Sequence, residues 1–224
     1  MKTKIIILLG MLTGTLWLPA QVTMTNSYSG TSALIPDGNP VGLEEQFNVS
    51  GVGGAISDIQ VQLGIIGGFN GDLYAYLVGP QGQLAVLLNR VGVTGSNPFG
   101  YGDEGMNITL DGLAANNIHD YGSSSYSLSG TTWAADGRNI DPQSSGAALY
   151  AAPTTANLSV FQTTDANGAW TFFIADVSAG GGTATLNSLM LTIITVPEPQ
   201  TWVMSLFGGV TLLVLRHSSR RSQK

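Results

Sequence analysis

The feature that most restricts the fold of this chain is an alternation of apolar and other residues at every second position. Between residues 59 and 65 the odd positions are isoleucine, valine, leucine and isoleucine, whereas the even positions are glutamine or glycine. Related patterns follow at 73–78, 84–88, 106–110, 170–174 and 189–193. Because successive side chains of a β-strand point to opposite faces, these runs predict strands with one buried face. No long stretch has helical periodicity.

Turn-forming residue pairs separate the expected strands. Among them are Asp37-Gly38, Asn70-Gly71, Asp136-Gly137 and Asn167-Gly168, each of which can supply a positive φ. Glycine accounts for 30 of the 224 residues, about twice the average share of roughly 7%. Short strands joined by such turns predict an all-β chain folded as an antiparallel, jelly-roll-like β-sandwich. We expect a single short helix in this domain, near residues 113–117.

Residues 121–157 lack both periodicities and are rich in serine, glycine and alanine. We interpret them as long loops over the surface of the sandwich. A disordered linker between two domains is the alternative, but the strand patterns on its two sides are too few for two independent cores.

Basic residues are concentrated at the two ends of the chain. The whole chain has 8 lysines and arginines against 14 acidic residues, which gives a net charge of -6. Between residues 21 and 196 the only bases are Arg90 and Arg138, which face thirteen acids. This sign excludes a basic nucleic-acid binder. The absence of cysteine excludes a disulfide framework, a thiol nucleophile and a cysteine-ligated metal.

The first residues have the layout of a secretory signal peptide. Lys2 and Lys4 precede an uncharged, mostly apolar run from Ile5 to Leu18, and Ala20 offers a small residue for cleavage. The apolar run is shorter than the ~20 residues that span a bilayer comfortably. We therefore predict a signal-peptide helix over 1–20 and an N-terminal lead-in over 21–33. A buried core helix is the alternative for 1–20.

A second apolar segment lies near the C-terminus. Residues 201–215 carry no charge, follow the motif Pro197-Glu198-Pro199, and precede a basic cluster of Arg216, Arg220 and Arg221. An apolar helix that ends in basic residues stops transfer with the basic side in the cytoplasm. At about 22 Å it is shorter than the ~30 Å hydrocarbon core. We predict a short transmembrane helix over 201–215 that suits a transient anchor better than a permanent one. A plain single-pass tail anchor is the alternative to this transient role.

Residues 196–224 resemble the PEP-CTERM sorting signal of Gram-negative bacteria in the motif, the apolar helix and the arginine tail. The resemblance implies recognition by an exosortase-type transpeptidase. It also implies a transient inner-membrane intermediate, cleavage near the motif, and delivery to the outer surface or the extracellular matrix. Such proteins occur in bacteria that make exopolysaccharide or flocs.

The central domain, residues 34–195, resembles the P/Homo B domain that follows the catalytic domain of subtilisin-like proprotein convertases. The elements that carry this resemblance are Gly71-Asp72-Leu73, Pro80-Gln81-Gly82, Gly168-Ala169-Trp170 and Asp176. The resemblance implies a non-catalytic jelly-roll β-sandwich that stabilises a protease or binds a partner. It departs from the family at Gly67-Gly68-Phe69, where a histidine is common, and at Leu186 or Leu189, where a tryptophan is common.

Two of these elements have a structural explanation in the residues themselves. Asn70-Gly71 allows a sharp turn into the strand at residue 73, and Asp72 can accept hydrogen bonds from N–H groups of that turn. Pro80-Gln81-Gly82 suits a tight hairpin turn between the strands at 73–78 and 84–88.

Residues suited to catalysis are scarce. The histidines are His119 and His217, and His217 falls in the basic tail. His119 lies in a polar stretch without a Gly-x-Ser-x-Gly elbow, and the chain has no zinc or phosphate-loop motif. Adjacent acids such as Glu44-Glu45 point to opposite faces of a strand and form a poor catalytic pair. We expect no enzymatic activity and interpret His119 as a surface histidine.

Calcium is the candidate cofactor, because carboxylates on glycine-rich loops suit this ion and few bases compete for them. P-domain relatives sometimes carry calcium, which supports the assignment. The candidate ligands, in order of preference, are Asp103, Glu104, Asp111, Asp136 and Asp141. Solvated surface acids of an exported acidic protein are the alternative.

Several aromatic residues lie in the loop-rich half of the domain: Tyr101, Tyr121, Tyr126, Trp133 and Tyr150. Such rings either cap the core or stack on sugars and anchor a protein partner. We predict an exported, exosortase-sorted surface or matrix protein, a non-catalytic binding or structural module linked to exopolysaccharide, to other surface proteins or to biofilm. The alternative is an accessory P domain that docks on a separate subtilisin-like protease, and a more distant one is a hydrolase.

Overall fold

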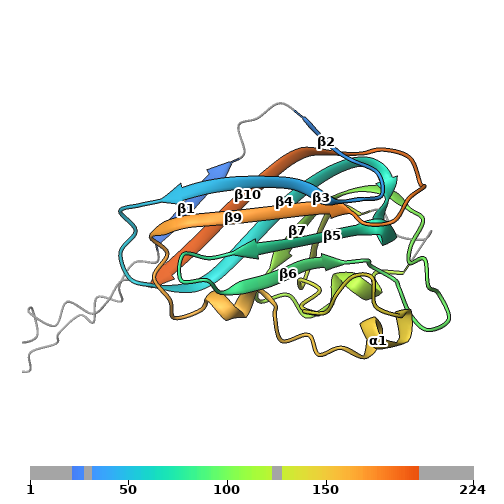
Figure 1. The fold of residues 1–224 in the computed structure, drawn as a ribbon. Coiled ribbons are helices and arrows are strands. Elements are labelled where there is room, and N and C mark those ends of the chain that lie inside the picture. The colour runs from blue at the N-terminus through green and yellow to red at the C-terminus, as the bar shows by residue number, and fades with distance from the viewer. Residues whose placement is uncertain (1–21, 28–31, 123–127, 197–224) are drawn as a thin grey trace, which may run out of the picture.

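The computed structural model describes residues 22–27, 32–122 and 128–196, which form a β-sandwich of two sheets (Figure 1). The strands of sheet A are β1 (Val22–Ser27), β2 (Ala33–Ile35), β4 (Ala55–Phe69), β7 (Glu104–Asp111), β8 (Ser129–Trp133) and β10 (Ala184–Val196). The strands of sheet B are β3 (Asn39–Val49), β5 (Leu73–Val78), β6 (Leu84–Asn89) and β9 (Gly168–Asp176).

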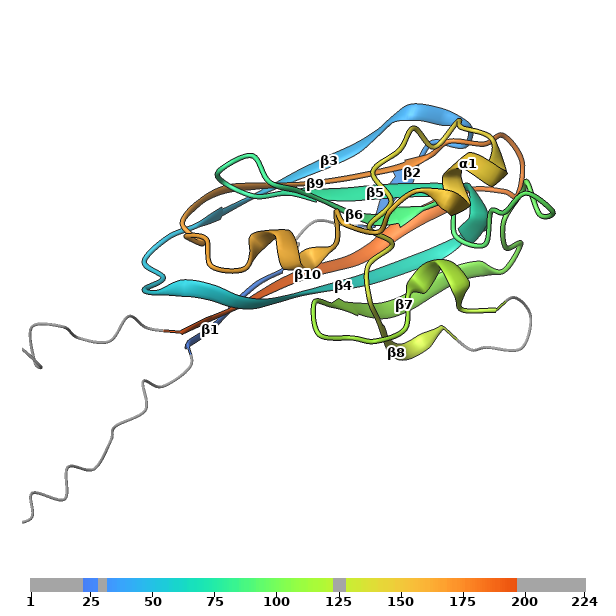
Figure 2. The ribbon, with the colours of Figure 1, turned by 90° about the horizontal axis from the view of Figure 1, so that it is seen from below.

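The predicted all-β sandwich is confirmed. Each run of alternating residues lies within a strand, and the run at 73–78 coincides with β5. Sheet A has the order β1-β10-β4-β7-β8 with β2 also paired to β10, and sheet B has the order β3-β9-β5-β6. The strand pairs are antiparallel with one exception among the described residues, because β8 runs parallel to β7. Figure 2 shows the sheets as two layers.

The predicted helix near residues 113–117 is wrong. There the Asp111 carboxylate accepts the N–H of Leu113 at 2.7 Å, and this bond closes a turn. The α-helix of the described chain is instead α1 (Gly146–Ala151), which lies in the segment that we interpreted as loops. It begins where the Ser145 hydroxyl accepts the N–H of Ala148. The short 3-10 helices are η1 (Asn70–Asp72), η2 (Ile118–Asp120) and η3 (Leu158–Phe161).

The core fills the space between the two sheets. In sheet A, Leu63 of β4 pairs with Leu189 of β10, and both side chains are buried. In sheet B, Trp170 and Phe172 of β9 are fully buried, and the ring of Phe161 packs on Trp170 with centroids 4.9 Å apart. Burial of each such side chain contributes about 1.5–3 kcal/mol. The domain is therefore held together mainly by apolar packing between its sheets.

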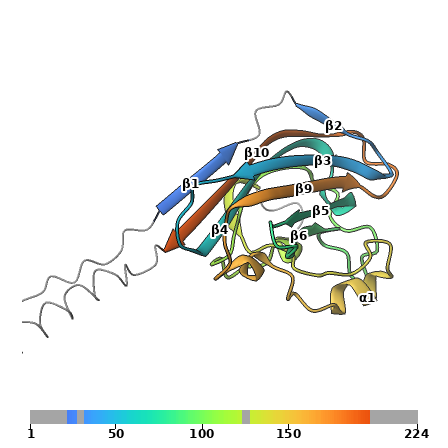
Figure 3. The same ribbon diagram turned by 60° about the vertical axis from the view of Figure 1, so that its left-hand side comes forward.

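The two edges of sheet B differ. The outer edge of β6 is covered by a loop, because Val86 donates to the Ala156 carbonyl at 2.7 Å and accepts from the Gly137 N–H at 2.9 Å. The opposite edge is β3, which pairs only with β9 among the described strands. Figure 3 shows β3 beside β9, with β2 and β10 of the other sheet nearby. The described chain thus closes one edge of sheet B by hydrogen bonds and leaves the other without a paired strand.

Most of the terminal segments lie outside the described residues. These comprise the signal peptide over 1–20, the motif Pro197-Glu198-Pro199, the helix over 201–215 and the cluster Arg216, Arg220 and Arg221. Within 22–27, 32–122 and 128–196, no helix is long and apolar enough to cross a membrane. The lead-in over 21–33 contains β1, whose backbone pairs with β10 from Val22 opposite Thr195 to Ser27 opposite Met190.

Candidate functional site

The motif at Gly71 brings a loop against the start of β5. The Gly71 N–H donates to the Tyr101 carbonyl of this loop at 2.8 Å. A Cβ on Gly71 would lie 2.5 Å from the Phe99 carbonyl oxygen, so only glycine fits this close approach. The sequence suggested a positive φ here, but the left-handed glycines of the described chain do not include Gly71. Steric room for the neighbouring loop therefore explains this glycine.

The predicted hairpin turn at Pro80-Gln81-Gly82 joins β5 to β6. The Gly79 N–H donates to the Gln83 carbonyl at 2.9 Å, and Gly82 has a φ of 82°. A side chain at Gly82 would strain this left-handed backbone. Gly168, with a φ of 130°, begins β9, and a Cβ there would lie 2.7 Å from the Cβ of Pro80. The two motifs therefore contact each other at one end of sheet B.

Asp72 and Asp176 meet at the other end of sheet B, where Leu73 pairs with Asp176. Asp72 does not accept the predicted turn N–H bonds; it lies near Ser178 and 3.9 Å from the Arg90 guanidinium. Burial raises the pKa of Asp72. Burial also raises the pKa of Asp176 to about 6, and the nearby charges of Asp72 and Asp37 act in the same direction. The side chain of Asp176 has no exposed surface, and its Oδ2 has no hydrogen-bond partner.

We expect Asp176→Asn to stabilise the protein near neutral pH. The folded-state pKa of about 6 exceeds the ordinary value of 3.8, so the folded state binds the proton more tightly than the unfolded state does. Stability from this group is present below about pH 4 and is lost as the pH rises through 6. The variant should gain up to about 3 kcal/mol at pH 7.5 and little at pH 4. Urea unfolding of both proteins at the two pH values measures this, and equal pH dependence in both would contradict it.

The predicted calcium ligands are dispersed. Asp103 and Glu104 are neighbours at the start of β7, Asp111 ends the same strand, and Asp141 lies in an exposed loop. Asp136 is fully buried and pairs with His119. No three acidic or histidine side chains among residues 22–27, 32–122 and 128–196 are grouped so that they could hold a metal ion. The structure therefore joins only the adjacent pair Asp103 and Glu104.

Each of the other candidate acids has its own protein partners. The Asp111 carboxylate accepts from the Gln60 amide at 2.9 Å. It also helps burial to raise the pKa of Asp58. The Asp141 carboxylate accepts the N–H of Gln143 at 2.8 Å. These contacts explain the two acids as structural groups of the sheet and the loop.

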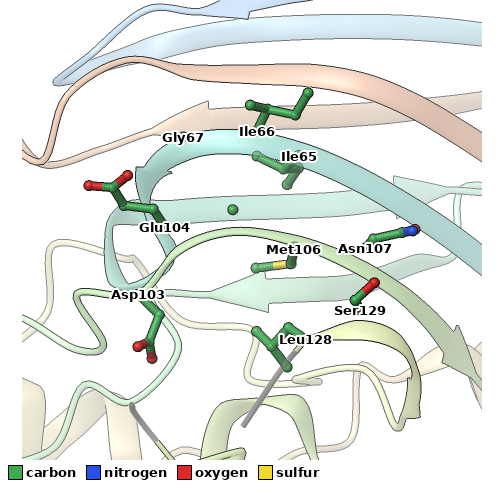
Figure 4. A pocket seen from close by; sticks show the side chains of 10 residues that line it. Ile65, Ile66, Gly67, Asp103, Glu104, Met106, Asn107, Leu128 and Ser129 are labelled. Atoms are coloured by element: carbon green, nitrogen blue, oxygen red, sulfur yellow. The ribbon is translucent and has the colours of Figure 1, made fainter. Parts of the chain in front are cut away.

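A surface pocket of about 430 Å³ lies where β4, β7 and β8 meet. Figure 4 shows the side chains of Asp103 and Glu104 at this pocket, together with Met106 and Leu128. Asp103 is already engaged, because the Tyr121 hydroxyl donates to its Oδ2 at 3.0 Å. Burial raises the pKa of that hydroxyl, which keeps it protonated as a donor. The pocket combines an apolar floor with two carboxylates.

His119 is buried, which contradicts its interpretation as a surface histidine. Its Nδ1 lies 2.7 Å from the Asp136 carboxylate and its Nε2 lies 3.0 Å from the Val93 carbonyl. Both neighbours are hydrogen-bond acceptors, so each ring nitrogen of His119 faces an acceptor of the protein itself. The polar residues of η2 and of the loop after β8 thus form an internal pair.

Arg138 extends this buried network. Its Nη1 lies 3.2 Å from the Asp136 carboxylate, and its guanidinium carbon lies 5.4 Å from the centre of the Tyr150 ring. Asp120 is 4.0 Å from the same guanidinium. The sequence did not predict this cluster, because His119 and Asp136 lie 17 residues apart in loops without periodicity.

The loop aromatics mostly complete the core. Tyr121 and Trp133 are buried, and the Tyr101 ring packs on Tyr121 with centroids 4.5 Å apart. Tyr150 is exposed and lies against Arg138. Tyr126 is outside the described residues. This arrangement agrees with the core-capping interpretation and leaves Tyr150 as the exposed ring of the group among the described residues.

The fold defines the chain as a β-sandwich protein, and comparisons with known proteins add no family to this class. No protein-family model and no curated protein matches the chain. A serine protease of Aeromonas sobria in complex with a chaperone is similar at 15% identity and a TM-score of 0.45, over 80% of this chain and 28% of that chain. The serine protease in a second structure has 14% identity and a TM-score of 0.44 with the same coverage. This chain spans little more than a quarter of their length, and these values assign it no activity.

Proposed function

We propose that this protein is a non-catalytic β-sandwich module that works by binding. The observation that carries the proposal is the burial of the histidine–aspartate pair, because the side chains of His119 and Asp136 have no exposed surface. A general base must reach the proton that it abstracts from a substrate. Both ring nitrogens of His119 instead lie within hydrogen-bond distance of groups of the protein itself.

The proposal includes export and sorting, which the sequence of the two ends supports. Residues 1–20 would direct the chain out of the cytoplasm, and 201–215 would hold it briefly in the inner membrane. An exosortase-type transpeptidase would then cleave near Pro197-Glu198-Pro199 and release the sandwich to the surface or matrix. There the module would bind exopolysaccharide or other surface proteins of a Gram-negative bacterium.

Expression of the full chain in a Gram-negative host with and without an exosortase tests this delivery. With the enzyme, we expect the sandwich in the surface or matrix fraction, and intact mass measurement should show loss of the C-terminal segment. Without it, the uncleaved chain should stay in the inner membrane. Replacement of Glu198 by Ala is the matched variant in the enzyme-containing host, and it should stay uncleaved. A chain that remains whole in the cytoplasm, or is cleaved equally in both hosts, would contradict the proposal.

A second candidate function is that of an accessory P domain for a separate subtilisin-like protease. It is favoured by the pairing of β5 with β9, which places Leu73 of one P-domain-like element opposite Asp176 of the other. If this function is correct, the purified protein should raise the Tm of such a protease at equimolar ratio. An unchanged protease Tm would leave the surface-module function as the better proposal.

A further inference from the structure

Strand β3 lies at an edge of sheet B, and from Leu43 to Val49 no other described strand pairs with its outer side. Residues Leu43 to Val49 pair one by one with Ile174 to Gly168 of β9, and the register shifts only before Leu43. On an edge strand about half of the backbone N–H and C=O groups point away from the sheet. Unlike β6, whose outer groups bond to a loop, β3 has β9 as its sole paired strand in the described part of the chain. Another extended chain could therefore add to sheet B here.

The side chains of β3 alternate between the outer and inner faces of sheet B, and this alternation determines which side chains an added strand would contact. Glu44 and Gln46 are exposed on the outer face of sheet B, and the Gln46 amide donates to Glu44 at 3.0 Å. Leu43 and Phe47 turn inward and pack against the core. Glu45 lies between these two, half-buried on the inner face. The edge thus presents one carboxylate on each face at consecutive positions.

A second copy of the chain is a poor occupant for this edge. Two β3 strands paired around Glu44 and Glu45 would bring carboxylates together, and like charges across strands are destabilising. Inward-pointing and edge charges are a common means of preventing such self-association. The glutamates therefore select against self-pairing.

Charge complementarity favours a basic occupant. The bases of the described chain other than the buried His119 are Arg90 and Arg138, and both are buried as well. The exposed surface of the described domain therefore carries carboxylates with no exposed cationic side chain to neutralise them. An added strand with two adjacent basic residues would place one beside Glu44 on the outer face and the other beside Glu45 on the inner face, since consecutive residues alternate.

The outer face next to this edge suits long basic side chains. Glu44 lies opposite Phe173, and Phe173 lies opposite Tyr76 in the next strand. The rings of Phe173 and Tyr76 are stacked, with centroids 4.8 Å apart. A lysine or arginine beside Glu44 could reach toward these rings along its apolar stem. Figure 1 shows no described helix across this face of sheet B.

We propose that the edge of β3 binds a partner protein by strand addition, and that the added segment is extended and carries two adjacent basic residues. Backbone hydrogen bonds along Leu43–Val49 would supply affinity, and Glu44 and Glu45 would set register and specificity. The inference rests on the proposed function as a binding module, for which it names the surface and the partner chemistry.

Binding of a synthetic peptide to the full chain in detergent tests the inference. The probe is the capped, fluorescently labelled peptide Thr-Val-Thr-Lys-Lys-Thr-Val-Thr. Its isomer Thr-Val-Lys-Thr-Lys-Thr-Val-Thr has the same charge but places both lysines on one face. We expect the first peptide to bind roughly tenfold more tightly by fluorescence anisotropy. Hydrogen exchange should show new protection of amides in residues 43–49, with none in β7.

Charge reversal locates the binding surface. Glu44→Lys should raise the Kd of the first peptide by about tenfold or more. Glu104→Lys is the matched control, because it makes the same charge change at an exposed position of sheet A. A peptide with N-methylated backbone amides should lose binding. Both variants are checked for native circular dichroism first.

Four outcomes would overturn the inference. They are the absence of peptide binding, equal binding of the two isomers, equal weakening by Glu44→Lys and Glu104→Lys, and a dimer of the chain that Glu44→Lys disrupts. The second and third would mean general attraction between a basic peptide and an acidic protein. None of them bears on cleavage near Pro197-Glu198-Pro199, so the delivery experiment tests the proposed function separately.

Discussion

Replacement of Asp136 by Ala should lower the free energy of unfolding by about 3–5 kcal/mol. The carboxylate is fully buried and lies between two potential cations, at 2.7 Å from His119 Nδ1 and 3.2 Å from Arg138 Nη1. It also accepts the N–H of Asn89 at 3.3 Å. Removal of the shared anion would leave charged or polar donors in the interior without a partner. Breaking one member of a buried ionic group costs more than the group contributes when complete.

Equilibrium unfolding in urea measures this effect, with Asp141→Ala as the matched control. Asp141 is also an aspartate of the loop region, but it is exposed and caps only the N–H of Gln143. Its removal should cost about 1 kcal/mol or less. If Asp136→Ala unfolds within 1 kcal/mol of the unmodified protein, the buried network does not support the loops as we describe. If the variant fails to fold, His119→Gln provides a milder test, because it keeps a polar side chain at the same place.

The strands that alternate cleanly are those that the sequence predicts. Strands β4, β5 and β9 have one face against the other sheet, so their buried residues recur at every second position. Strand β3 escaped prediction because Glu45 occupies the inward position between Leu43 and Phe47, so its apolar residues do not recur at every second position. Its sequence begins with Asn39-Pro40 and continues through Gly42 and two glutamates, residues with low strand propensity. Pairing with β9 decides its structure.

The buried polar cluster shows a different limit of sequence reasoning. His119 and Asp136 each stand in polar, aperiodic segments, and a polar segment predicts exposure. In the structure these segments instead pack beside β6, where the Asp136 N–H donates to the Leu87 carbonyl at 3.1 Å. The buried cluster of His119, Asp136 and Arg138 forms through contacts between loops that are distant in the sequence. No local pattern of residues encodes such contacts, so only the assembled sandwich shows them.

The edge of β3 and the buried cluster together describe how charge is distributed in the domain. The two arginines of the described chain form hydrogen bonds inside the domain. Arg90 donates to the Gly71 carbonyl at 3.2 Å, and Arg138 donates to the Asp136 carboxylate. Except for Asp120, which lies 4.0 Å from the Arg138 guanidinium, the exposed acids of the described chain therefore form no ion pair with these two arginines. The net charge of -6 for the whole chain understates this, because most bases lie in the terminal segments. A surface of one sign attracts partners of the opposite sign and repels copies of itself.

Replacement of Trp170 by Ala should lower the free energy of unfolding by about 3–5 kcal/mol. The side chain is fully buried in β9, and its Nε1–H donates to the Ala166 carbonyl at 2.9 Å. Phe161 of η3 packs against its ring at 4.9 Å. The substitution would therefore open a cavity between the two sheets and leave the carbonyl without its donor. It would also loosen η3, which packs against both β4 and β6.

Thermal and urea unfolding monitored by far-ultraviolet circular dichroism measure the loss without relying on tryptophan fluorescence. Thr171→Ala is the matched control, because this neighbour in β9 is only half-buried and lies on the outer face; it should cost within about 1 kcal/mol. Trp170→Phe separates the two contributions, since it keeps an aromatic ring and removes the donor, and should cost about 1–3 kcal/mol. Equal stability of Trp170→Ala and Thr171→Ala would contradict a core centred on this residue. A loss in Trp170→Phe as large as in Trp170→Ala would assign the effect to the hydrogen bond instead of to packing.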